Sequence, residues 1–167
     1  MNSSARKSWI RFILWISVVL WMAVIFCLSA QEASQSSSLS GSAIWSVAEI
    51  TQPGFREMSR IEQENIVEQY QYITRKTAHM LAYTALGILC TAALFQYTIS
   101  RKMRAAAAFA VCTGYACTDE IHQLFVAGRS GQISDVGIDA LGVCLGICAA
   151  MFVHWAWNTR HAKNRKL

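Results

Sequence analysis

The ionisable residues that could support chemistry occur in three short stretches of an otherwise apolar chain. The first stretch contains Lys76, His79 and Tyr83. Steps of three and four residues place these side chains on one face of a helix. A lysine, a histidine and a tyrosine on one face could hold an anionic group and exchange a proton with it.

The second and third stretches are rich in carboxylates. Asp119 and Gln123 lie one helical turn apart, and Asp135 and Asp139 repeat the same spacing after a loop that contains Arg129. Neighbouring carboxylates hold one proton more tightly, and a histidine beside a carboxylate forms an acid–base pair. The arginine offers a bidentate fork for a phosphate or pyrophosphate.

These residue types predict a set of roles. The predicted acid–base residues are His79, Asp119 and Glu120, and the predicted substrate-binding residues are Lys76, Tyr83, Gln123, Arg129 and Asp135. No nucleophile is evident, because Ser130 and Ser134 lack an obvious partner. A divalent metal held by His79, Asp119, Glu120 and His122 is an alternative. No HExxH register supports a metal, and we predict no cofactor.

The composition indicates a membrane protein. The chain has 167 residues, of which 54% are hydrophobic and 15% charged, with a formal net charge of +5. The basic residues form three short clusters beside apolar runs, which argues against a nucleic-acid-binding face. None of the six cysteines belongs to a CxxC pair, so neither a zinc site nor a disulfide framework is indicated.

Four apolar segments have the length that a bilayer-spanning helix needs, about 20 residues. They cover about residues 9–29, 77–99, 105–125 and 133–157. We therefore expect an all-α polytopic protein with one domain over residues 1–167. The outer loop, 30–75, is expected to begin with a flexible serine-rich linker and to continue as an amphipathic helix at the membrane interface, with a solvated helix as the alternative.

Charge asymmetry predicts the orientation. Ten basic residues, with no acidic residue among them, flank one end of the four segments. The positive-inside rule places both termini in the cytoplasm and the polar stretches on the extracytoplasmic side of the cytoplasmic membrane. A cleavable signal peptide is the alternative interpretation of the first segment. It is disfavoured because Leu28 stands where a small residue is preferred.

In this orientation the three polar stretches lie on one side of the membrane. The second segment begins, the third ends and the fourth begins on the same side, so their ionisable groups reach the same depth. A charge at the centre of a bilayer costs about 2.5–3.5 kcal/mol, which makes such groups functional candidates. The alternative is a salt-bridge network that only locks the helices. Gly142 and Gly146 share a face with Asp139 and are expected to pack inside the bundle, with a homodimer contact as the alternative.

Several stretches together resemble the VanZ-like family. "KTAHMLAYTALG" is similar to its K-x-x-H-x-x-x-Y-x-x-L-G segment, and "DEIHQLFVAGRSGQISDVGIDALG" to its D-E-x-x-Q, G-R and D-V signature. "LSAQ", at the end of the first segment, resembles its short Ser/Gln turn. Two positions depart from the pattern: Ala127 stands where proline is common, and Asp139 where asparagine is usual.

The resemblance implies an integral membrane protein associated with low-level resistance to the glycopeptide teicoplanin. Two functions are compatible with the polar residues. One is an enzyme that acts on a lipid-linked cell-envelope substrate, and the other is a binding or immunity protein without turnover. The expected partners are membrane lipids and a lipid-linked cell-wall precursor or lipoglycopeptide. A transporter is the least favoured alternative for one four-helix chain.

Overall fold

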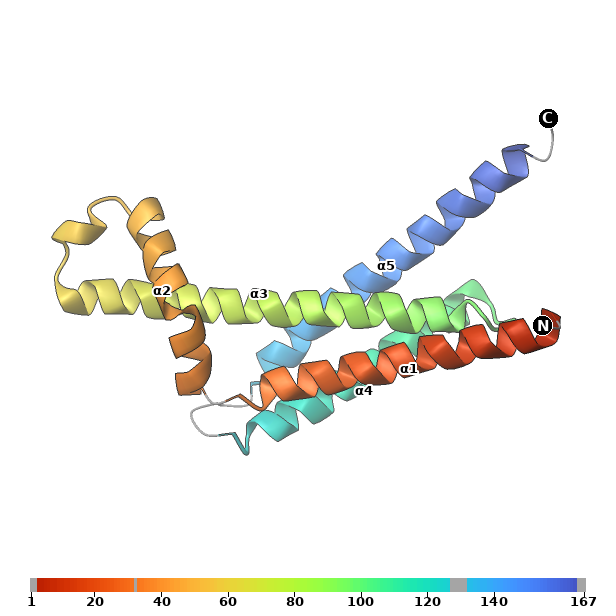
Figure 1. The fold of residues 1–167 in the computed structure, drawn as a ribbon, viewed down its shortest axis with the longest axis horizontal. Helices are drawn as coiled ribbons and strands as arrows, with labels where there is room; N and C mark the ends of the chain where they lie inside the picture. Colours follow the sequence, from red (N-terminus) through yellow and green to blue (C-terminus); the bar gives the residue numbers. More distant parts are fainter. Residues whose placement is uncertain (1–2, 32, 127–131, 165–167) are drawn as a thin grey trace.

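The computed structural model describes residues 3–31, 33–126 and 132–164, and all the regular secondary structure in these ranges is helical (Figure 1). The elements are α1 (Ser3–Ser29), α2 (Ala33–Thr51), the short 3₁₀ helix η1 (Phe55–Glu57), α3 (Arg60–Leu94), α4 (Arg101–Gln123) and α5 (Ile133–Asn164). No strand occurs in the described residues, so the predicted all-α class is confirmed.

Four of these helices form a bundle in which α3 contacts each of the others. In Figure 1, α1 and α4 run beside one part of α3, and α5 crosses it and diverges towards its own C-terminal end. Where α3 meets α4, small side chains fill the core, and Cys90, Ala93, Ala108, Cys112 and Ala116 have no exposed surface. Such small residues let helix backbones approach closely.

Glycines make the crossing of α3 and α5 tight. A Cβ atom added to Gly142 would overlap the carbonyl oxygen of Met80, and one added to Gly146 would overlap that of Thr84. The face of α5 that carries Gly142 and Gly146 is therefore turned inward, as predicted. These glycines pack against α3 of the same chain.

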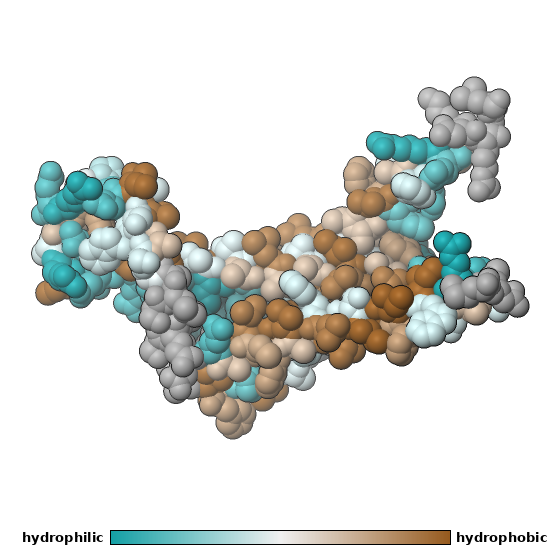
Figure 2. Space-filling model, in the orientation of Figure 1, coloured by the Kyte–Doolittle hydropathy of each residue, from teal (hydrophilic) through white to brown (hydrophobic). Residues whose placement is uncertain are grey.

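The outer surface of the bundle is apolar along most of its length. Large side chains such as Phe12, Leu20 and Val153 are more than half exposed, and Figure 2 shows hydrophobic residues between two hydrophilic ends. Three helices are long and apolar enough to cross a membrane, over Ser4–Ser29, Arg60–Leu94 and Ile133–Ala162. The predicted fourth crossing, α4, is less apolar because it is alanine-rich between a basic start and a polar end.

The region between the first two predicted spans differs from its prediction. The serine-rich stretch is part of α2, so the flexible linker expected there is wrong. The amphipathic segment continues directly into the apolar part of α3, and it extends beyond the bundle as one rod (Figure 1). A helix of 35 residues is about 52 Å long, more than the roughly 30 Å of a bilayer core.

A small second core holds α2 against this extension of α3. Ile44, Ala48, Phe55 and Val67 are buried together, and the Trp45 ring meets the Phe55 ring edge-on at 5.3 Å between centroids. Burial of apolar surface against α3 explains why a serine-rich sequence becomes helical here, since packing overrides its weak local preference. We call α2, η1 and the part of α3 packed against them the outer head, after the side of the membrane on which the charge pattern predicts them.

Candidate functional site

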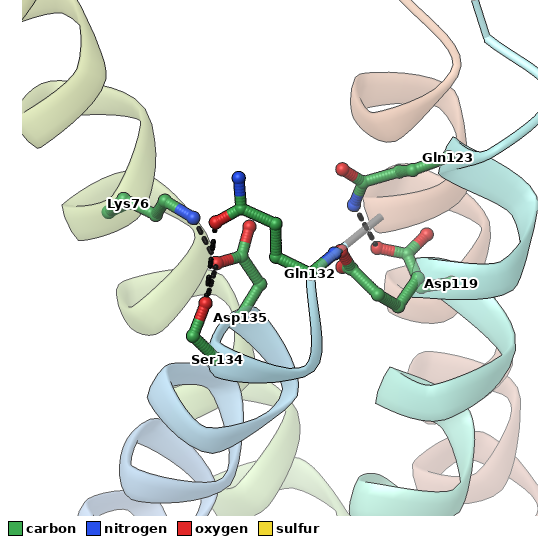
Figure 3. Close-up of polar contacts among 7 residues, drawn as sticks. Lys76, Asp119, Gln123, Gln132, Ser134 and Asp135 are labelled. Carbon is green, nitrogen blue, oxygen red and sulfur yellow. Dashed lines mark hydrogen bonds and ion pairs between the residues drawn. The ribbon is translucent and has the colours of Figure 1, made fainter. Parts of the chain in front are cut away.

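Polar side chains from several helices meet at the end of the bundle next to the outer head. Lys76 of α3 forms an ion pair with Asp135 of α5, and their side chains are only 13% and 19% exposed (Figure 3). Ser134 adds a hydrogen bond of 3.3 Å to the same carboxylate. This pair joins the first turns of α5 to the middle of α3.

Asp119 lies deeper and connects α4 to α1. Its Oδ2 atom accepts a hydrogen bond of 2.8 Å from Ser29, the last residue of α1, and one of 3.3 Å from Gln123. Both Asp119 and Ser29 are essentially inaccessible, with exposures of 2% and 0%. The other carboxylate oxygen, Oδ1, is buried without a hydrogen-bond partner.

Glu120 links the ends of α4 and α5. Its carboxylate accepts a hydrogen bond from the backbone N–H of Gln132, which immediately precedes α5. Glu120 is 8% exposed and Gln132 is exposed, so this bond is partly buried. A carboxylate at the N-terminus of a helix is stabilised there by the unpaired N–H groups and the helix dipole.

Two further oxygen-bearing side chains face Asp119 from neighbouring helices. Tyr83 of α3 is fully buried, and its hydroxyl lies close enough to interact with the Asp119 carboxylate, with Asp139 nearby. Asp139 of α5 is 2% exposed. Carboxylates of α4 and α5 and a phenol of α3 therefore meet inside the bundle.

A very small cavity lies beside this group. Its volume is about 10 Å³, which is room for roughly one water molecule. The lining residues come from α3, α4 and α5: Arg75, Lys76, His79, Gln123, Asp135, Ile138 and Asp139. His79 is thus next to the Lys76–Asp135 pair, as its helical spacing suggested.

Not every predicted candidate joins this cluster. The His122 ring stacks on Phe26 of α1, with 4.2 Å between centroids and 27° between planes, so it belongs to the α1–α4 contact. No group of three His, Cys, Asp or Glu side chains suited to a metal occurs among the described residues. Arg129 lies outside the described residues.

The structure adds participants that the sequence analysis left out of its list. Ser29 donates the shorter of the two hydrogen bonds that Asp119 accepts, and its only sequence signal was its place in the "LSAQ" stretch that closes the first apolar run. Asp139 is the most deeply placed carboxylate of α5. Its inward orientation followed from its register with Gly142, although its departure from the family pattern kept it off the list.

Comparison with protein-family models tests the family resemblance that the motifs suggested. The family model described as VanZ/LLP1 matches residues 14–154, which include all of α3 and α4 and most of α1 and α5. The chain belongs to the VanZ/LLP1 family. Neither curated proteins nor solved structures give a match. Membership identifies this VanZ/LLP1 protein as a membrane protein of a family linked to glycopeptide resistance, and the predicted family is confirmed.

Proposed function

We propose that this protein binds the phosphate-bearing headgroup of a lipid-linked cell-envelope compound at the polar end of its helix bundle. One observation carries the proposal. Ionisable side chains of α3, α4 and α5 gather at one end of an apolar bundle, where Lys76 and Asp135 are largely buried. Isolated charges are expensive in such surroundings, so their concentration at one place favours a ligand site.

The proposed arrangement has all four bundle helices crossing the membrane, with both termini in the cytoplasm. Helix α4 has 23 residues and is about 34 Å long, enough for a bilayer core. It packs against α1, α3 and α5, so it shares their depth. Arg6, Lys7 and Arg101 lie at helix starts opposite the polar end, which agrees with the positive-inside rule. Alkaline phosphatase fused to the C-terminus is then inactive, whereas a fluorescent protein fused there is bright.

Within this site, the proposed binding contacts are those of Lys76 and Arg129 with the phosphate. Tyr83, Gln123 and Asp135 orient the ligand and the lysine. The structure supports a binding function ahead of turnover, because Asp119 and Glu120 already accept hydrogen bonds from Ser29 and Gln132. The cavity of about 10 Å³ must widen before a headgroup can enter.

Turnover of the bound lipid is the second candidate. His79 and Asp139 line the same small cavity as Lys76, so an acid–base group and a cation are adjacent. In this version His79, Asp119 and Glu120 transfer protons to and from the headgroup. A third version, in which the cluster is only a structural ion network, predicts that no lipid depends on it.

Native mass spectrometry of co-purified lipids tests these versions. Wild type is compared with Arg129→Ala, Asp119→Asn and the control Arg101→Ala, which removes an exposed arginine at the opposite end of the bundle. We expect a phosphorylated lipid on wild type and the control, and its loss from Arg129→Ala. Accumulation of intact lipid on Asp119→Asn favours turnover. Equal lipid on all four proteins contradicts the proposal.

The resistance link is tested in cells. Expression of the wild type in a teicoplanin-susceptible bacterium is expected to raise the inhibitory concentration of teicoplanin, and Arg129→Ala is expected to abolish the increase. A similar increase from Arg129→Ala would separate resistance from the proposed headgroup contact.

A further inference from the structure

Two neighbouring cations of α3 share one aromatic ring beside the small cavity. The Arg75 guanidinium lies over the Tyr72 ring at 5.9 Å from its centroid, and the Lys76 ammonium lies over the same ring at 4.9 Å. Both distances are within the roughly 6 Å at which a cation is attracted to the face of a ring. Arg75 and Lys76 also line the cavity, so the ring holds two positive charges at the cavity wall.

The two cations differ in their carboxylate partners. Lys76 is paired with Asp135, so its charge is balanced within the chain. In the part of the chain that the structure describes, the other ion pairs belong to Arg56 and Arg60, and no carboxylate pairs with Arg75. Arg75 is nevertheless partly buried. Because a charge withdrawn from water is unfavourable without a partner, this guanidinium is suited to an anionic ligand.

The position of Arg75 along α3 corresponds to the level of lipid phosphates. Helix α3 ends at Leu94, shortly before the basic residues Arg101 and Lys102 that begin α4. At about 1.5 Å per residue, α3 rises about 28 Å from Arg75 to Leu94, close to the roughly 30 Å of a bilayer core. When the end of α3 lies at one face of the membrane core, Arg75 therefore lies at the other face.

We infer that Arg75 binds the phosphate of the lipid headgroup directly and that Tyr72 positions Arg75 for this contact. The inference rests on the proposed function and adds a binding residue to the same site. A guanidinium presents two parallel N–H donors to two phosphate oxygens, which an ammonium group does not do. The Tyr72 ring keeps the guanidinium at the cavity wall, and Lys76 remains beside it on the same ring.

The carboxylates of the cavity wall lie on the inner side of Arg75. Asp135 is neutralised by Lys76, and α3 and α5 run into the bundle in the same direction from this pair. Asp139, one turn after Asp135, therefore lies deeper and is only 2% exposed, whereas Arg75 precedes Lys76 on the side of the outer head. A phosphate that arrives from the lipid headgroup region reaches Arg75 before it meets Asp139.

Binding of two lipids that share their acyl chains tests the inference, measured by native mass spectrometry on the purified full-length protein. Dioleoyl phosphatidic acid carries a phosphate where dioleoylglycerol has a hydroxyl. We expect wild type to bind phosphatidic acid more tightly than dioleoylglycerol. Arg75→Gln should weaken binding of phosphatidic acid roughly 10- to 100-fold and leave dioleoylglycerol unchanged. Arg75→Lys should lose less, because it keeps the charge without the fork.

Two variants of Tyr72 test its positioning role. Tyr72→Leu should weaken binding of phosphatidic acid by about two- to fivefold, and Tyr72→Phe, which keeps the ring face, should bind like wild type. The Tyr72 side chain is 46% exposed, so both variants are expected to fold. A merely structural role would weaken both lipids alike. Equal weakening of both lipids by Tyr72→Leu, or wild-type binding of phosphatidic acid, overturns the positioning role.

The matched control is Arg60→Gln, which should leave binding of both lipids unchanged. Arg60 belongs to the same helix and lies over the Trp45 ring at 6.0 Å, but it already has Glu64 as its carboxylate partner at 3.0 Å. The control therefore removes an arginine with a similar ring contact from the outer head.

The outcomes separate this inference from the proposed function. Undiminished binding of phosphatidic acid by Arg75→Gln overturns the inference alone and leaves the phosphate to Lys76 and Arg129. A wild type without preference for phosphatidic acid overturns both. Retention of phosphatidic acid in a large excess of inorganic phosphate supports a lipid ligand. Displacement by inorganic phosphate identifies free phosphate as the ligand and overturns the assignment to a lipid headgroup.

Discussion

Ser29 at the end of α1 donates a hydrogen bond of 2.8 Å to Asp119 near the end of α4, and both residues are buried. The two residues are 90 positions apart in the chain. Few other polar contacts join α1 to the rest of the bundle, the nearest being Trp21 to the Ala82 carbonyl and Tyr115 to the Met22 carbonyl. The Ser29–Asp119 bond therefore anchors α1 to the polar end.

Ser29→Ala is expected to destabilise the protein by about 1–3 kcal/mol, because it removes the shorter of the two hydrogen bonds to a buried carboxylate oxygen. Thermal unfolding in detergent measures the effect. The control is Ser17→Ala, which removes only a local hydrogen bond to the Ile13 carbonyl within α1. Equal unfolding temperatures for the two variants would show that Asp119 does not depend on Ser29.

This bond illustrates what the sequence could and could not predict. Helical spacing placed Lys76, His79 and Tyr83 on one face, and the order of the apolar segments brought three helix ends to the same depth. The pairing of particular residues depends on how each helix is rotated about its axis and where it crosses its neighbours. The periodicity of a single segment does not contain that information, so the contact between Ser29 and Asp119 could not be predicted.

The prediction of a flexible linker before residue 43 was wrong for a different physical reason. Serine and glycine between 34 and 42 are typical of a flexible linker, yet this stretch lies within α2. Ile44 and Ala48 follow it and pack on Val67, a contact between segments far apart in the chain. Such tertiary packing outweighs local composition. The long apolar runs were correctly predicted to be helices, because a chain exposed to lipid must satisfy its backbone hydrogen bonds internally and few structures besides a helix do so.

Gly146→Ala is expected to destabilise the bundle by about 1–3 kcal/mol, because the added methyl group overlaps the Thr84 carbonyl of α3. Thermal unfolding again provides the measurement. Gly114→Ala is the matched control, since no atom lies within 4 Å of its added methyl group, and a helical alanine is favoured over glycine by about 1 kcal/mol. A neutral Gly146→Ala would contradict the close crossing of α3 and α5.

Ser59→Ala is expected to loosen the start of α3 in the outer head. The Ser59 side chain accepts the backbone N–H of Glu62, and the Glu62 carboxylate accepts the Ser59 N–H in return. Loss of such a cap is worth about 1 kcal/mol, or about fivefold faster amide exchange in the first turn. Hydrogen exchange with mass spectrometry should show the change there and none in α4. Ser46→Ala, which removes a bond within α2, is the control.

A double-mutant cycle on Lys76 and Asp135 distinguishes a structural role of this ion pair from a role in ligand binding. Lys76→Met and Asp135→Asn each strand one charge in a site where the side chains are 13% and 19% exposed. Each single variant should therefore lose about 2–3 kcal/mol of unfolding free energy, somewhat less than for a fully buried pair. The double variant removes both charges and should lose less than the sum of the single losses, by about 0.5–3 kcal/mol.

Lipid retention in the same cycle then decides the function of the pair. If Lys76 contacts a headgroup, the double variant regains stability but still loses the co-purified phosphorylated lipid, because no side chain replaces the ammonium group. Native mass spectrometry compares the lipid that remains bound to the folded fraction of each of the four proteins. A double variant that is stable and keeps its lipid would assign Lys76 and Asp135 to helix packing alone, and the headgroup contact would then have to come from other residues.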